Sequence, residues 1–430
     1  MAKNTNLDIR QMTFYQVFPR QFSNKQNFEG IIDDLDRIKG LGIDVLYLLP
    51  IHPLGIKSRK GLKGSPYSIY DYYAINSEYG TLEDFKKLIS LAHEKGLKVM
   101  MDIVINHTSR DSILTKEHPE WFYHNEKGEF ANRIGDWSDI TDLDYTNKEV
   151  WTYMSDMLYY WAQLVDGFRC DVAPLIPLDF WIEARQRIET LDKSFIWLTE
   201  SVHPGFIKYL RSMDYDCFTD SEMYQAFDVC YDYDIFDYMY HYLDDPSLLN
   251  EWIEAIKRQE TMYPRNYIKL RSFENHDQKR LRFRTRDEAH FIQMLTFQFF
   301  LKGPSFIYNG MEHQATHEPS LFDDDLIIWD ESKSVEPLIK KLITLKKDAL
   351  FRDGHFNIEN QNGAILVTYE KDDEYLLGIF NLEDQPSIKL DLKDGVYANI
   401  FNQKPIEVKQ GKVILDHEPM MIRTKKVYKQ

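Results

Sequence analysis

The sequence predicts an α/β protein: a (β/α)₈ TIM barrel with a small inserted domain after the third strand and a C-terminal all-β sandwich domain. Three observations lead to this prediction. Apolar runs alternate with segments of helical spacing until eight strands have been passed, which is the count that closes a barrel. A polar stretch at 108–146 interrupts the alternation. After about residue 353, short strands separated by turns replace the helices.

The domain boundaries follow from these changes of pattern. We expect residues 1–107 and 147–350 to form the barrel, residues 108–146 to form the inserted domain, and residues 353–430 to form the C-terminal domain. The inserted stretch is rich in Asp, Asn, His and Trp and contains no helix of useful length. A segment of this kind between a strand and the next helix is usually functional or a small domain.

The individual elements are read from apolar runs and from helical spacing. The expected barrel strands are 14–18, 45–49, 99–105, 167–173, 195–199, 217–219, 267–273 and 305–308. The expected helices are 28–39, 81–95, 148–165, 179–189, 221–257, 289–301 and 335–347. Thr81, with Asp84 three residues later, is the expected N-cap of the second helix. The expected strands of the C-terminal domain are 364–369, 375–380, 388–392, 396–401 and 412–415.

The composition argues against several kinds of partner. The formal net charge of -17 argues against nucleic acid and against an anionic membrane surface, and no apolar run is long enough to span a bilayer. Cys170, Cys217 and Cys230 show neither metal-ligand spacing nor a pairing pattern, which indicates free thiols in a reducing compartment. The N-terminal residues contain no apolar signal segment, so we expect a cytoplasmic protein.

Polar side chains gather where the predicted strands end, and barrels of this kind carry their active sites at that end. The residues at these ends are Asp102, Asn106, His107, Arg169, Asp171, Glu200, Glu274, Asn275, His276 and Asp277. The sequence contains no HExxH or CxxC spacing, no glycine-rich phosphate loop and no GxSxG motif. Carboxylates without metal ligands or a nucleophilic serine therefore have to carry the chemistry.

Three of these carboxylates, Asp171, Glu200 and Asp277, suggest glycoside cleavage, in which one acts as acid and base and another as nucleophile or water activator. Arg169 lies two residues before Asp171, on the same face of a strand, and would hold that carboxylate ionised. Glu200 follows an apolar strand, where desolvation raises the pKa toward that of a general acid. The alternative interpretation of each residue alone is a structural ion pair.

Five segments, in this order, resemble the alpha-amylase superfamily, glycoside hydrolase family 13, and an intracellular alpha-amylase-like member of it. They are DIVINH at 102–107, GFRCDVA at 167–173, WLTE at 197–200, FENHD at 273–277 and GPSFIYNGME at 303–312. The resemblance extends over essentially the whole chain. It implies a retaining mechanism on α-glucosidic bonds, with Asp171 as nucleophile, Glu200 as acid/base and Asp277 as the carboxylate that binds sugar hydroxyls.

The resemblance also implies binding residues and a possible metal. Those expected to hold the cleaved glucose are Tyr67, His107, Arg169 and His276. Asn106 and Asp142 match ligands of the calcium ion that many members bind, but Leu175 stands where calcium-dependent members often carry histidine. We therefore expect that no cofactor is required and do not favour a bound calcium ion.

The bond specificity stays open on the sequence. Asp142-Leu143-Asp144 resembles the α-1,4-acting amylases, whereas Val172 after the nucleophile resembles oligo-1,6-glucosidases and neopullulanase-like enzymes. The first hypothesis is an α-amylase that cleaves α-1,4 bonds in maltodextrins, with an α-glucan oligosaccharide as partner. The alternatives are an oligo-1,6-glucosidase, a neopullulanase-like enzyme, a 4-α-glucanotransferase, an inactive carbohydrate-binding barrel, or a polysaccharide binder acting through the C-terminal domain. The oligomeric state is left open.

Overall fold

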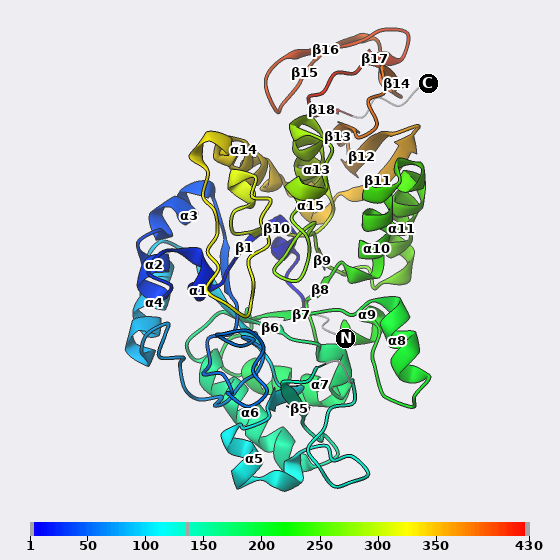
Figure 1. The fold of residues 1–430 in the computed structure, drawn as a ribbon. Coiled ribbons are helices and arrows are strands. Elements are labelled where there is room, and N and C mark those ends of the chain that lie inside the picture. Colours follow the sequence, from blue (N-terminus) through cyan, green and yellow to red (C-terminus); the bar gives the residue numbers. More distant parts are fainter. Residues whose placement is uncertain (1–3, 135–136, 426–430) are drawn as a thin grey trace.

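The computed structural model describes residues 4–134 and 137–425, and its centre is a parallel β-barrel. Within these residues the hydrogen-bonded strand order is β10-β1-β2-β3-β6-β7-β8-β9. A parallel bridge between Arg271, which follows β9, and Ser305 of β10 joins the two ends of this order. The strands are β1 (Thr13–Val17), β2 (Val45–Leu48), β3 (Lys98–Ile103), β6 (Gly167–Cys170), β7 (Ile196–Thr199), β8 (Val229–Tyr231), β9 (Lys269–Leu270) and β10 (Ser305–Tyr308). The predicted TIM barrel is confirmed (Figure 1).

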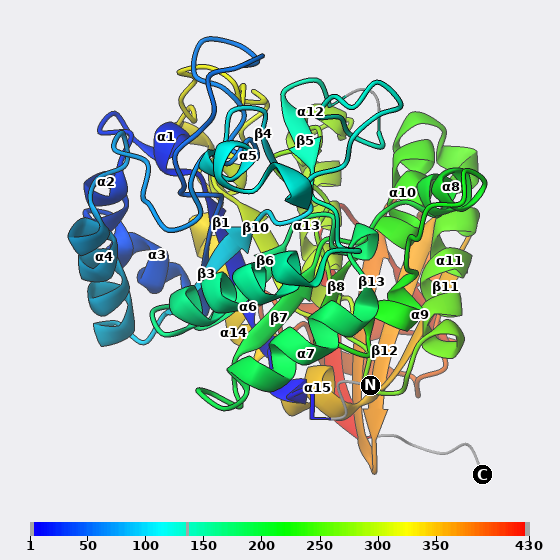
Figure 2. The same ribbon diagram turned by 90° about the horizontal axis from the view of Figure 1, so that it is seen from below.

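Helices surround the barrel on its outer side, as Figure 2 shows for α3, α4, α6 and α7. The helices are α1 (Pro19–Phe22), α2 (Phe28–Ile32), α3 (Leu35–Leu41), α4 (Leu82–Glu94), α5 (Ile113–Glu117), α6 (Lys148–Ala162), α7 (Leu178–Ile188), α8 (Pro204–Arg211), α9 (Asp220–Met223), α10 (Tyr233–Asp244), α11 (Leu249–Met262), α12 (Leu281–Arg284), α13 (Glu288–Phe300), α14 (Glu336–Lys346) and α15 (Ala349–Asp353). The predicted cap of α4 is confirmed as a capping box, in which Thr81 and Asp84 each accept the other's backbone N–H.

The sixth barrel strand was predicted in the wrong place. Residues 217–219 precede α9, and Thr219 begins that helix because its hydroxyl and backbone N–H both bond to the Glu222 carboxylate. The strand is β8, which lies inside the segment predicted as one helix over 221–257. Its three residues are all buried and too few to show a period of two, so their strand character is invisible in the pattern.

The segment between β3 and α6 is largely irregular, as predicted. It contains the antiparallel pair β4 (His107–Ser109) and β5 (Ile140–Asp142), besides the short helix α5. This pair lies directly beyond the carboxyl end of β3, so the segment is placed beside the strand ends of the barrel. The residue boundaries of the three domains stay a prediction.

The C-terminal region contains a four-stranded antiparallel sheet and two strand pairs. The sheet consists of β11 (His355–Gln361), β12 (Ala364–Lys371), β13 (Glu374–Asn381) and β18 (Met420–Lys425), and the pairs are β14 (Ser387–Lys389) with β17 (Lys412–Ile414) and β15 (Gly395–Ala398) with β16 (Pro405–Val408). Along β13, Leu376 and Phe380 pack in the main core with the barrel, whereas Leu377 and Ile379 face the strand pairs. Because side chains alternate along the strand, one face of this sheet packs against the barrel and the other against the strand pairs. The sequence reading missed β11, β16 and β18.

None of the helices among the described residues combines the length and apolar character that a membrane crossing requires. This finding agrees with the absence of a long apolar run in the sequence.

The barrel closes where the chain before β10 passes over β9. Gly303 has a φ of +127°, and a Cβ atom added there would lie 2.0 Å from the carbonyl oxygen of Lys269 in β9. The Lys269 side chain is buried and pairs with Asp220 and Asp234. Both the backbone conformation and the close approach therefore require glycine at position 303.

Gly303→Ala is expected to destabilise the protein by about 3 kcal/mol or more, because the methyl group forces the closing strands apart. The measurement is the midpoint of thermal or urea unfolding. Gly205→Ala is the matched control, since a Cβ atom at Gly205, in α8, meets no atom within 4 Å. That change should be neutral or slightly stabilising. Equal stability of Gly303→Ala and the wild type would contradict this account of the closure.

Candidate active site

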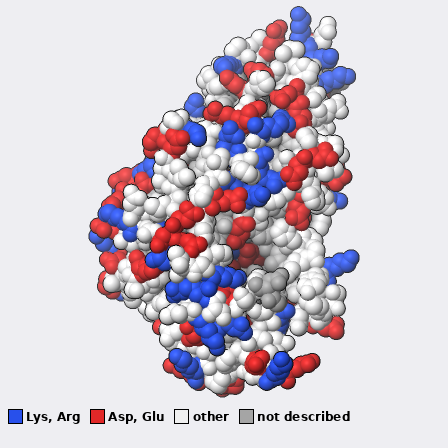
Figure 3. Space-filling model, in the orientation of Figure 1, with Lys and Arg blue, Asp and Glu red and all other residues white. Residues whose placement is uncertain are grey.

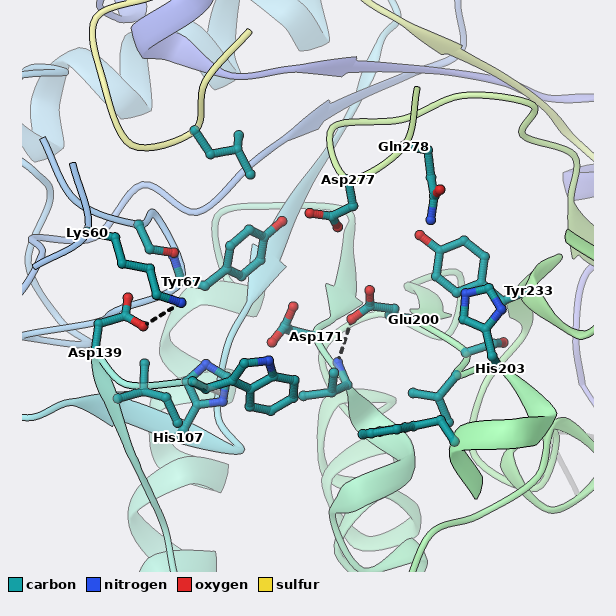
Figure 4. Close-up of a pocket in the computed structure, with 18 of the residues that line it drawn as sticks. Lys60, Tyr67, His107, Asp139, Asp171, Glu200, His203, Tyr233, Asp277 and Gln278 are labelled. Carbon is teal, nitrogen blue, oxygen red and sulfur yellow. Dashed lines mark hydrogen bonds and ion pairs between the residues drawn. The ribbon is translucent and has the colours of Figure 1, made fainter. Parts of the chain in front are cut away.

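The carboxyl ends of the barrel strands open into a cleft of about 370 Å³ that contains the three predicted carboxylates. Asp171 follows β6, Glu200 follows β7, and Asp277 lies in the loop after β9. Figure 4 shows their carboxyl groups facing the same space, with Tyr67 and His107 beside them. On the surface, acidic side chains lie in a hollow near the middle of one face (Figure 3). The structure therefore brings the predicted residues together.

Arg169 lies beneath this cleft and contacts three carboxylates. Its Nη1 atom is 2.8 Å from Asp102 Oδ1 and 2.8 Å from Asp171 Oδ1, and its Nη2 atom is 3.0 Å from Glu200 Oε1. The Arg169 side chain is completely buried, and so is that of Asp102. One guanidinium thus contacts three acidic groups, Asp102 in β3, Asp171 just after β6 and Glu200 just after β7, and holds them around a single positive charge.

The two central carboxyl groups share this cation and perturb each other. Burial raises the pKa of Asp171, the charge of Glu200 raises it further, and Arg169 opposes both effects. Burial also raises the pKa of Glu200, against the pull of Arg169 and with a contribution from Asp277. Arg169 therefore limits the rise in the pKa of Asp171 rather than depressing it. Because the charge of Glu200 raises the pKa of Asp171, ionisation of one group favours protonation of the other.

Val172 makes the turn that follows Asp171. Its φ is +35°, in the left-handed region that β-branched residues rarely adopt. In this conformation its N–H donates to Glu200 Oε2 at 2.8 Å, while the N–H of Asp171 donates to Ile103 of β3. The strained turn thus fixes Glu200 relative to Asp171. The sequence suggested only that Val172 bears on specificity.

Asp277 differs from the other two carboxylates because it opens toward the cleft, with 41% of its side chain exposed. Burial opposes its ionisation, but His276 and Arg169 outweigh that effect and hold the pKa of Asp277 below its usual value. His276 Nε2 lies 2.9 Å from Asp277 Oδ2. The side chain of Gln16 lies 3.0 Å from His276 Nδ1, which leaves the Nε2 proton for Asp277 or for the hydroxyl of Tyr67.

Of the remaining predicted residues, Tyr67 and His107 line the cleft, whereas the His276 side chain is completely buried behind Tyr67. The Tyr67 ring stacks on His276, with centroids 5.6 Å apart, and its hydroxyl lies 3.1 Å from Asp102. Burial lowers the pKa of His107 to about 4, so this imidazole is neutral at pH 7. Trp137 packs against His107. A flat aromatic face beside neutral donors suits the binding of a sugar ring.

The sequence reading missed several residues that line the cleft: Lys60, Ser65, Trp137, Asp139, Ile140, Val202, His203, Phe206, Tyr233, Gln278, Leu321 and Phe322. Except for Ile140, which begins β5, they come from connecting segments or from the first turn of a helix. Lys60 lies in the long loop after β2, which its length alone marks as functional. Tyr233 was assigned to the interior of a predicted helix, whereas it begins α10 at the carboxyl end of β8.

The candidate calcium ligands lie together beside a cationic side chain. Asn106, Asp142 and Leu175 line a common cavity of about 300 Å³, but Arg133 lines it as well. The backbone N–H of Arg133 donates to Asp142 Oδ2 at 2.7 Å, and its guanidinium lies 3.5 Å from the same oxygen. No group of three or more His, Cys, Asp or Glu side chains in the described chain could hold a metal ion. A cationic side chain thus stands beside the carboxylate that calcium would need.

Comparison with known proteins gives a consistent assignment. The family described as "Alpha amylase, catalytic domain" matches residues 16–120 and 113–363, and "Bacterial Alpha amylase C-terminal domain" matches residues 356–422. The solved structure of an alpha-amylase from Lactobacillus plantarum is 46% identical, covers 97% of this chain and 100% of its own, and has a TM-score of 0.95.

Two further relatives are more distant. A noncanonic maltogenic alpha-amylase, AmyB, from Thermotoga neapolitana is 32% identical, covers 98% of this chain and 100% of its own, and has a TM-score of 0.86. An intracellular maltogenic amylase from Bacillus subtilis is 24% identical over an alignment of 420 positions, which covers 87% of this chain and 68% of the relative.

Arg169→Met is expected to destabilise the protein by about 3–5 kcal/mol, because it leaves three buried carboxyl groups without their cation. Without Arg169 the pKa values of Asp171 and Glu200 rise further. A group whose pKa is higher in the folded than in the unfolded state contributes less to stability as the pH increases from its unfolded-state pKa to its folded-state pKa. The difference in Tm between variant and wild type should therefore widen from pH 5 to pH 8.

Arg187→Met is the control for this experiment, because Arg187 pairs with Asp156 at the surface. It should change stability by about 1 kcal/mol or less, with little dependence on pH. A pH-independent loss in Arg169→Met would argue against the shared-cation interpretation.

Proposed function

We propose that this chain, which belongs to the alpha-amylase family of glycoside hydrolases, cleaves α-1,4-glucosidic bonds in maltodextrins with retention of configuration. The observation that carries the proposal is the pair Asp171 and Glu200 on adjacent nitrogens of one buried guanidinium. Retaining enzymes need two carboxyl groups about 5–5.5 Å apart, and inverting enzymes need a wider gap for water. Two groups bound to one guanidinium favour the narrow spacing.

In the proposed mechanism, Asp171 attacks the anomeric carbon while Glu200 donates its proton to the departing glycosidic oxygen. The C–O bond to the leaving sugar breaks and a glycosyl ester with Asp171 forms. Glu200, now ionised, takes a proton from water, which displaces Asp171 and restores both groups. The raised pKa of Glu200 suits the first step, and the N–H of Val172 supports its ionised form in the second.

Asp277 and the residues beside it would hold the sugar that is cleaved. The low pKa of Asp277 keeps it ionised, so it can accept hydrogen bonds from ring hydroxyls and stabilise positive charge in the transition state. Tyr67 lines the cleft with the buried His276 ring stacked behind it, and His107 is neutral. Together they would bind a glucose ring between Tyr67 and the nucleophile.

The choice of α-1,4 bonds and maltodextrins is supported by the amylases among the relatives and by a cleft that suits a neutral sugar. The test is the product profile on maltoheptaose, pullulan and isomaltose, with the anomeric form of new ends read by NMR. We expect cleavage of maltoheptaose and α-anomeric products. Cleavage of isomaltose alone would overturn the α-1,4 assignment, and β-anomeric products would overturn retention. The cytoplasmic location stays a prediction.

Glu200→Gln should lower turnover of maltoheptaose by a factor on the order of 10²–10⁴, because the leaving oxygen loses its proton donor. An aryl glycoside with an activated leaving group needs less help, and its first step should be largely spared. The variant also removes the charge that raises the pKa of Asp171. In the pH profile of the rate on the aryl glycoside, the acidic limb should therefore move to lower pH. The alkaline limb, which reports loss of the acid proton, should disappear.

Asp171→Asn is the reference for this measurement and should be inactive on both substrates, since an amide is a poor nucleophile. Equal losses of Glu200→Gln on both substrates, or an unmoved acidic limb, would count against the assigned roles.

We further propose that the activity requires no metal ion, because Arg133 stands beside Asp142. Dialysis against EDTA should leave both kcat/KM on maltoheptaose and the Tm unchanged, and added calcium should raise neither. A chelator-induced fall in Tm that calcium reverses would refute this.

A further inference from the structure

The proposed mechanism fixes the direction in which a glucan lies in the cleft. The leaving sugar must depart beside Glu200, its proton donor, and the glycone must lie on the opposite side of Asp171. Figure 4 shows Tyr233 and His203 beyond Glu200, and Lys60 and Asp139 beyond Tyr67. The non-reducing part of the chain therefore points toward Lys60 and Asp139. The following inference rests on the proposed function.

Three separate segments meet at that end of the cleft. They are the loop after β2, the segment between β3 and α6, and the loop after β10. Lys60 Nζ lies 3.0 Å from Asp139 Oδ1, which joins the first two. The N–H of Leu62 donates to Asp323 Oδ1 and that of Lys63 donates to the carbonyl of Phe322, both at 2.8 Å, which joins the first to the third. We call Lys60, Asp139, Phe322 and Asp323 the latch.

The latch is built for close contact between these loops. Gly61 has a φ of +61°, and a Cβ atom added there would lie 2.6 Å from the carbonyl oxygen of Phe322. Arg20, in α1, contacts the same two loops: its Nη1 donates to the carbonyl oxygen of Gly64 in the loop after β2 and to that of Leu321 in the loop after β10, each at 3.1 Å. Because Arg20 is buried, these two loops are fixed to the barrel as well as to each other.

The ionic part of the latch is also held in place. The Asp139 side chain is 4% exposed, and a carboxylate buried to that extent requires a partner, which Lys60 supplies. The Lys60 ammonium lies 5.9 Å from the centre of the Phe322 ring. Lys60, Asp139, Leu321 and Phe322 all line the catalytic cleft. They therefore form a wall of this cleft rather than a distant surface feature.

We propose that the latch closes the glycone end of the cleft, so that the enzyme removes short units from non-reducing ends rather than cutting within long chains. A glucan extending further would have to separate the Lys60–Asp139 pair and displace the Phe322 ring. On the aglycone side, His203 pairs with Asp237 and stacks on Tyr233, which joins the two neighbouring segments that follow β7 and β8 rather than three separate loops. The latch then determines chain-length preference while the barrel determines the chemistry.

The test compares two aryl maltoheptaosides, one free and one blocked by a 4,6-O-ethylidene group on its non-reducing glucose. Wild-type enzyme should cleave the free substrate at least about tenfold faster than the blocked one, since the block adds bulk where the latch leaves no room. The double variant Lys60→Ala/Asp139→Ala and the variant Phe322→Ala should raise the ratio of blocked to free cleavage by about tenfold. The paired replacement avoids a buried, unpartnered Asp139.

Lys57→Ala is the matched control, because it removes an exposed side chain of the same loop and keeps the backbone N–H that bonds to Asp111. It should behave as wild type on both substrates. Equal cleavage of both substrates by wild type, with mainly internal cuts in end-labelled maltoheptaose, would overturn the latch proposal and leave the proposed function intact. No cleavage of either substrate would overturn the proposed function instead. The comparison of the two substrates is made on the wild-type enzyme, so its result does not depend on whether the variants fold.

Discussion

The buried guanidinium of Arg169 is the interaction on which the rest of the site depends. In the register of the barrel, Asp102 of β3 is the direct neighbour of Arg169 in β6, and Glu200 follows the next strand. Three strands therefore end in carboxylates around one cation. A shift of one residue in any of these strands would turn its polar side chain to the other face and leave a buried charge unpaired. The same contact thus favours one strand register and opposes the rise that burial causes in the pKa values of Asp171 and Glu200.

Much of this arrangement could be predicted from the sequence, because it follows from local periods. Arg169 and Asp171 share a face since side chains alternate along a strand, and strand ends meet at one side of a parallel barrel. Thr81 and Asp84 form a capping box at the spacing that predicts one. The strand β8 was missed because three buried residues carry no measurable period. For β18, pairing with β13 provides the strand character that composition does not show.

The residues that shape the rest of the cleft were missed for a different reason. Lys60 and Asp139 are far apart in the sequence and lie in segments without regular structure, so neither spacing nor alternation relates them. The same holds for the contacts of Leu62 and Lys63 with the loop after β10. Their pairing depends on how three loops fold over the barrel. The residue types of the site can therefore be predicted from the sequence. The length of the cleft cannot, because it depends on how the loops contact one another in the folded protein.

The left-handed turn at Val172 has a consequence for how this protein can change. A β-branched residue in that conformation costs on the order of 1–3 kcal/mol, and the surrounding fold has to offset it. Selection for heat resistance alone would favour glycine or asparagine at this position, since either relieves the backbone. Glycine would also loosen the amide that orients Glu200. Stability and the alignment of Glu200 are therefore opposed at this single residue, because a change that relieves the backbone strain would also loosen the amide that holds the Glu200 carboxylate.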